Sequence, residues 1–184
     1  MGVVFLCLAV MLSGCTIPIP ITITQTLNLI GEVPVPPNDL GLLESGRFEI
    51  NDEFCELPSL DELREMAREH ISGFLAQRLE PRSIEITRLS FIATQGNFNS
   101  INRVEAILWA DGKELIDVSA QAPAEGFGTR ADLEPDVNPD LAQIILDGIS
   151  CLKYYALMRG TLPEETLVFK VEAELKLRFG VRLF

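Results

Sequence analysis

Histidine and acidic side chains are the residues whose types could give this chain catalysis or metal binding. The 184 residues include a single histidine, His70. Without a second histidine, most general-base arrangements and histidine-containing metal sites are unavailable. We find no Gly-x-Ser-x-Gly, Ser-x-x-Lys or phosphate-cradling glycine motif. The sequence therefore predicts a non-enzymatic protein without a cofactor, and carboxylate pairs such as Asp52-Glu53 and Glu164-Glu165 leave an acid-based hydrolase as the alternative.

Oxygen-bearing side chains alternate along one proline-containing segment, as they do in a calcium loop. These residues are Asp132, Glu134, Asp136, Asn138 and Asp140. The sixth position is Val137 instead of glycine, and the twelfth is Gln143 instead of glutamate, so an EF-hand is not expected. Two interpretations remain, a solvated acidic loop and a weak calcium site of the extracellular type.

The N-terminus combines an uncharged apolar run with a cysteine. Val3–Leu12 is apolar and too short to cross a bilayer, which takes about 20 residues. It has the length of a signal-peptide core and is followed by small residues. Leu12-Ser13-Gly14-Cys15 resembles the lipobox of bacterial lipoproteins, although no lysine or arginine precedes the run. The resemblance implies removal of residues 1–14, acylation of Cys15 and attachment to a membrane, the outer one in preference to the inner because Thr16 follows.

Four cysteines are present, and the lipoprotein resemblance accounts for two of them. Cys7 would leave with the signal peptide and Cys15 would carry lipid, so Cys55 and Cys151 remain. An exported chain tends to pair two such cysteines, in a loop of about 97 residues here; two separate buried thiols are the alternative.

The composition indicates one globular domain with an acidic surface. Hydrophobic residues make up 47% of the chain, and the net charge is −12. A strongly acidic domain repels phosphate backbones, so nucleic acid is not an expected partner. We predict a signal peptide over 1–14, a lipidated tether and edge strand over 15–37, and a single domain over 38–184.

One long helix is predicted, over about 60–79. Ser59 and Glu62 form a capping box, and apolar residues then recur at steps of three and four. His70 borders this stripe. Pro81 prevents the helix from continuing beyond about Glu80.

Alternating residues predict strands in most of the remaining chain. A change of phase indicates a bulge near Thr87-Arg88, and Asp111-Gly112 predicts a tight type I′ turn. We expect a loop over 122–138, a helical turn or two over 140–146, and a strand over 150–160. A closing hairpin would join that last strand to a long strand over 167–183 with a bend or free end near Gly180.

The pattern of strands predicts an antiparallel β-sandwich with the helix packed on it. It resembles uncharacterised bacterial lipoproteins with an immunoglobulin-like sandwich. Trp109, Phe127, Tyr154 and Tyr155 could line a ligand site or belong to the core, with Phe127 the more exposed because glycines flank it. We therefore expect a lipid-anchored binding or structural module of the cell envelope with an unknown envelope protein or ligand as partner; a carrier of an apolar ligand is a third possibility.

Overall fold

The computed structural model describes residues 16–35, 47–55, 57–69, 79–149, 151–161 and 165–182. It confirms an antiparallel β-sandwich of two four-stranded sheets. The first sheet contains, in spatial order, β1 (Thr16–Val35), β8 (Leu167–Arg182), β3 (Leu79–Gln95) and β6 (Arg130–Leu133). The second contains β2 (Arg47–Phe54), β7 (Leu152–Gly160), β4 (Ile101–Ala110) and β5 (Lys113–Gln121).

The strand order is that of a jelly roll. In the orders β1-β8-β3-β6 and β2-β7-β4-β5, an early strand pairs with a late one in each sheet, β1 with β8 and β2 with β7. An immunoglobulin-like sandwich would instead place the first strand beside the second. The expected hairpin between β7 and β8 is also wrong, because these strands lie in different sheets. Alternation identifies which face of a strand is buried, but it does not identify the neighbouring strand.

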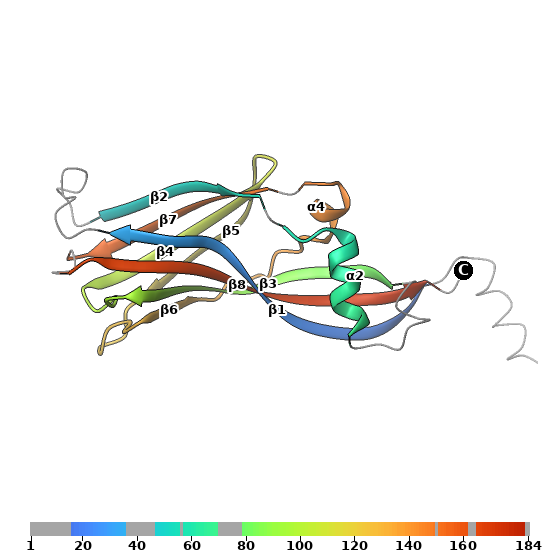
Figure 1. Ribbon diagram of the computed structural model, residues 1–184, viewed down its shortest axis with the longest axis horizontal. Coiled ribbons are helices and arrows are strands. Elements are labelled where there is room, and N and C mark those ends of the chain that lie inside the picture. Colours follow the sequence, from blue (N-terminus) through green and yellow to red (C-terminus); the bar gives the residue numbers. More distant parts are fainter. Residues whose placement is uncertain are drawn as a thin grey trace, which may run out of the picture.

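The long strands of the first sheet extend beyond the second sheet. Figure 1 shows β1, β8 and β3 continuing past the sandwich, with α2 (Leu60–Arg68) lying across that part. Leu63 and Ala67 of α2 are fully buried, and the Nε of Arg64 donates a hydrogen bond to the carbonyl of Leu79 at 3.1 Å. The short helix α4 (Ala142–Leu146) also packs on β3. The sheet is therefore covered by strands in one half and by helices in the other.

Strand β8 forms the centre of the core. Its inward residues, from Leu167 to Phe179, alternate as predicted and are buried. Phe169 packs against Phe91 and Phe98 with ring centroids 6.0 and 5.9 Å apart. The strand stays paired through Arg182, so it has no free end at Gly180. Figure 1 shows it twisting with β1 and β3 near the middle of the sheet.

Several local predictions are confirmed. The register of β3 against β8 shifts between Ile86 and Arg88, which makes Thr87 the bulged residue. Asp111 and Gly112 both have positive φ, of 48° and 73°, as a type I′ turn requires. The capping box is present, with the Ser59 amide donating to Glu62 Oε2 at 2.7 Å.

Other boundaries differ from the prediction. The described helix ends at Arg68, and Leu79, expected to end the helix, instead begins β3; residues 70–78 of the predicted helix lie outside the described residues. Pro81 is accommodated in β3 because, among the described strands, only β8 pairs with β3 at this position; β6 pairs only with Leu89–Ile92. The expected loop over 122–138 is shortened, because Arg130–Leu133 forms β6.

Candidate functional site

The structure pairs Cys55 with Cys151 in a disulfide, as the cysteine count predicted. Cys55 directly follows β2, and Cys151 directly precedes β7. Because Phe54 faces Leu152 across these strands, the next residue pair in register is the two cysteines. The disulfide therefore joins the two strands at the end of the sheet.

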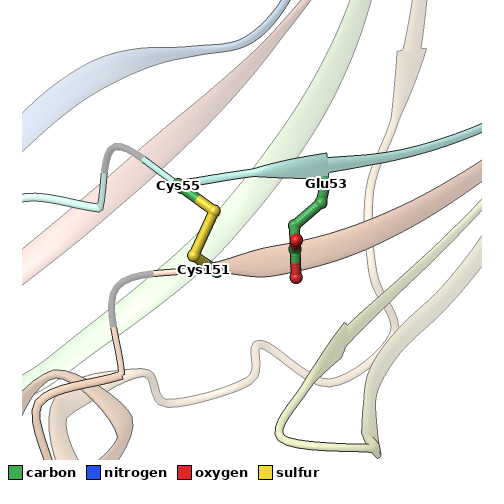
Figure 2. Close-up of side chains that lie close together, drawn as sticks. All are labelled: Glu53, Cys55 and Cys151. Carbon is green, nitrogen blue, oxygen red and sulfur yellow. A yellow bond between two sulfur atoms is a disulfide. The ribbon is translucent and has the colours of Figure 1, made fainter.

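Glu53 lies beside this disulfide (Figure 2). Its carboxylate oxygen and the two Sγ atoms all lie within 4.8 Å of one another, the only such group of three potential metal ligands within the described residues. Metals bind thiolates, whereas these sulfur atoms are bonded to each other. The cluster is therefore no metal centre in the oxidised protein.

An open hollow of about 300 Å³ adjoins the disulfide. Its lining comes from three segments of the chain: Glu53, then Trp109, Asp111 and Gly112, then Ile149, Cys151 and Lys153. Glu53, Lys153 and Trp109 form one row across β2, β7 and β4, because Lys153 faces both of the others in register. The volume lies at the lower end of the ~300–1,000 Å³ typical of small-molecule sites.

A tight turn and the disulfide hold two sides of the hollow in place. The type I′ turn at Asp111-Gly112 forms one side, and the disulfide holds the segment that carries Cys151 and Ile149 on another. Trp109 is half-buried, whereas Glu53 and Lys153 are exposed. The hollow thus offers an aromatic surface, two carboxylates and one ammonium group. The sequence pointed to Trp109 as a ligand candidate and to Glu53 only as one of a carboxylate pair with Asp52, because the residues of the hollow meet through strand register.

The proposed calcium ligands do not form a site. Asp132 lies in β6, and Arg130 Nε contacts its Oδ1 at 2.8 Å. Asp140 accepts hydrogen bonds from the amides of Ile84 and Ala142 at 2.8 and 2.9 Å. In the described chain, Glu134 and Asp136 do not join these two within ligating distance. The alternation places one residue in a strand, one as a backbone cap and two as exposed acids, so the described residues are not gathered around a common point as calcium ligands would be.

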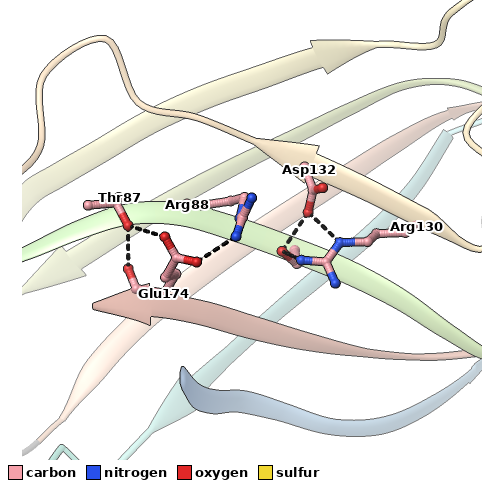
Figure 3. Close-up of polar contacts among 6 residues, drawn as sticks. Thr87, Arg88, Arg130, Asp132 and Glu174 are labelled. Atoms are coloured by element: carbon pink, nitrogen blue, oxygen red, sulfur yellow. Dashed lines mark hydrogen bonds and ion pairs between the residues drawn. The ribbon is translucent and has the colours of Figure 1, made fainter. Parts of the chain in front are cut away.

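Asp132 belongs instead to a polar cluster on the outer face of the first sheet (Figure 3). Ser90, only 3% exposed, donates to Asp132 Oδ1 at 2.6 Å and accepts from Arg130 at 2.8 Å. Beside it, the bulged Thr87 donates to Glu174, which also pairs with Arg88 at 2.5 Å. The bulge thus turns a hydroxyl and a guanidinium toward the same carboxylate.

Replacing Asp132 with asparagine is expected to reduce the loss of stability at low pH. Burial raises the pKa of Asp132, but hydrogen bonds from Ser90 and Arg130 and the charges of Arg130 and Arg88 outweigh it, so the pKa lies below its ordinary 3.8. A lowered pKa stabilises the fold above the unfolded-state value, and this contribution disappears as the pH falls through the folded-state value. Urea unfolding at pH 7, 5, 4 and 3 should show wild type and variant converging below pH 4. Asp117→Asn, at an exposed site on β5, is the control, and parallel curves for wild type and Asp132→Asn would contradict the assignment.

The other residues that the sequence singled out differ in burial, and three of them lie outside the described part of the chain. Tyr154 is buried, Tyr155 is half-buried, and Phe127, expected to be exposed, is half-buried against the core. Asp52 and Glu53 lie in β2. Cys15, His70 and Glu164 lie outside the described residues. None of the described helices has the length and apolar character to cross a membrane.

Comparisons with known proteins give likeness of fold only. No family model and no curated protein matches the chain. A candidate secreted protein from Eubacterium rectale is similar at 11% identity and a TM-score of 0.38; the match covers 91% of this chain but 42% of that one. The decameric BFDV capsid protein is similar at 12% identity and a TM-score of 0.38; the match covers 85% of this chain and 99% of that one. Dimeric latent PorU from Porphyromonas gingivalis is similar at 10% identity and a TM-score of 0.33; the match covers 89% of this chain and 13% of that one. These scores carry no functional argument, so the function of this jelly-roll protein must be argued from its own residues.

Proposed function

We propose that the chain is a lipid-anchored, non-enzymatic binding module of the bacterial cell envelope, and that the hollow beside Trp109 is its ligand site. The observation that carries this proposal is the meeting of an aromatic ring, two carboxylates and an ammonium group in one hollow beside a disulfide. The disulfide supports an oxidising, extracytoplasmic location. The lipobox at Cys15 supports the anchor, and β1 begins at the next residue.

The lining of the hollow suits a saccharide unit. A sugar ring has an apolar C–H face, which packs on an aromatic ring, and hydroxyl groups that both donate and accept hydrogen bonds. Trp109 supplies the aromatic surface, Glu53 and Asp111 accept, and Lys153 donates. Exported binding modules meet such ligands in the glycans of the envelope.

The test uses the detergent-extracted full chain with its disulfide intact. Trp109 is the only tryptophan, so its fluorescence reports directly on the hollow. We expect a saturable change on titration with at least one member of a panel of neutral and N-acetylated oligosaccharides. Intact mass measurement of the same preparation should give residues 15–184 plus acyl chains and two fewer hydrogens; an unprocessed mass would refute the anchor alone.

Replacing Glu53 with glutamine is expected to weaken saccharide binding about tenfold or more, because a hydrogen bond to a charged group contributes about 1.5–3 kcal/mol. Calorimetry measures the change, and Glu49→Gln, an exposed glutamate on the same strand, is the matched control. If both variants bind the saccharide as wild type does, the ligand site lies elsewhere. If no member of the panel binds, the proposal that the ligand is a saccharide is refuted.

A hydrolase remains the alternative, because Glu53 and Asp111 are two carboxylates that line one hollow. Release of shorter saccharides during the same titrations, abolished by Glu53→Gln, would favour the hydrolase over the binding module.

A further inference from the structure

Strand β1 has an edge without a strand partner in the described part of the chain. It runs from Thr16 to Val35 and pairs with β8 on one side only. An edge strand presents unpaired N–H and C=O groups, which can pair with another strand. Natural proteins protect such edges with charges, prolines and bulges.

The middle of β1 lacks these protections. Pro18, Pro20 and Pro34 lie toward its ends, and register shifts follow Ile17 and Asn28. Between them, Ile21–Asn28 keeps an unbroken register with β8, from Ile21 opposite Phe179 to Asn28 opposite Glu172. No residue from Thr16 to Gly31 is charged. This central segment of β1 is therefore an uncharged, regular edge.

The other edges of the two described sheets carry charges. Those edges are β6, β2 and β5. Their charged residues include Arg130 and Asp132 in β6, Glu49 and Glu53 in β2, and Lys113 and Asp117 in β5. The uncharged character is thus particular to β1.

We propose that the central segment of β1 pairs in antiparallel fashion with the same segment of a second copy of this chain. Each copy has a net charge of −12, so two copies repel unless they meet where charge is absent or balanced. The central segment has no charge, and beside it Glu174 of β8 is paired with Arg88. A twofold axis through Gln25 would place the exposed Thr24 of each copy opposite Thr26 of the other, a favourable cross-strand pair.

Sedimentation of the full chain in density-matched detergent tests this pairing. We expect a concentration-dependent dimer, and at least a tenfold weaker association for the double variant Thr24→Lys/Thr26→Lys, because lysines would face lysines across the axis. Ser119→Lys/Gln121→Lys is the matched control, because it adds the same charge at exposed positions on the β5 edge and should leave the dimer intact. A single-copy mass at all concentrations, or equal weakening by both variants, would overturn the proposal.

A cysteine cross-link gives a test that does not depend on how the lysine variant folds. Strand pairing at the axis brings the two Gln25 Cα atoms to ~4.5–5.5 Å, within the range for a disulfide. Gln25→Cys should therefore form a covalent dimer under mild oxidation, whereas Ser119→Cys should not. A lack of cross-linking at Gln25 and its neighbours would overturn the proposed register and the dimer with it.

Discussion

Replacing both Cys55 and Cys151 with serine is expected to lower the free energy of unfolding by about 4–5 kcal/mol. The disulfide joins residues separated by 96 positions, and in the chain-entropy model a closed loop of about 100 residues contributes about 4.7 kcal/mol. Serine should fit in the folded protein, because Cys55 is exposed and Cys151 is half-buried. The expected decrease in melting temperature is about 10–20 °C for a domain of this size.

Urea unfolding of the oxidised wild type and the double serine variant measures the effect. Reduction of the wild type by a thiol reagent should produce a similar loss, and the same reagent should leave the serine variant unchanged. The serine variant should also bind the saccharide more weakly, because Cys151 lines the hollow. A loss below about 1 kcal/mol would mean that the unfolded chain is already restricted without the disulfide.

Sequence reasoning was most successful where local chemistry determines the structure. The alternation from Leu167 to Phe179 predicted which residues of β8 are buried, and the change of phase located the bulge at Thr87. Asp111-Gly112 specified its turn, because few residue pairs tolerate two positive φ angles. Each of these features depends on neighbours within a few residues.

The failures concern partners that are distant in the sequence. A strand over 150–160 was predicted and β7 is found there, but its neighbours β2 and β4 were not predicted, because alternation does not encode pairing. Asp132 was interpreted as a calcium ligand because the sequence does not show that Ser90 and Arg130 meet it. Glu53 was named only as one of a carboxylate pair with Asp52, and Lys153 was not named, because only the register of three strands brings them beside Trp109.

Replacing Gly160 with alanine is expected to destabilise the protein by about 3 kcal/mol or more, because this position has no space for a side chain. Gly160 ends β7 and faces Ile101 at the start of β4. A Cβ there would lie 2.2 Å from the carbonyl oxygen of Ser100 and 2.7 Å from the Cα of Ile101. Both are backbone atoms, so no rotation of a flexible side chain relieves the contact.

Gly148→Ala is the control that separates this close approach from the general effect of losing a glycine. Gly148 has φ +78°, and a Cβ there would meet nothing within 4 Å, so its replacement should cost only the ~1–2 kcal/mol of a left-handed backbone. Urea unfolding of both variants, with the disulfide intact, gives the comparison. The Ser100 carbonyl also accepts the Thr161 amide at 2.9 Å, so relief of the clash in Gly160→Ala should expose the Thr161 amide to faster hydrogen exchange. An equal decrease in the free energy of unfolding for the two variants would show that β4 and β7 can separate at this end without destabilising the protein. Their contact there would then contribute little to the stability of the sandwich.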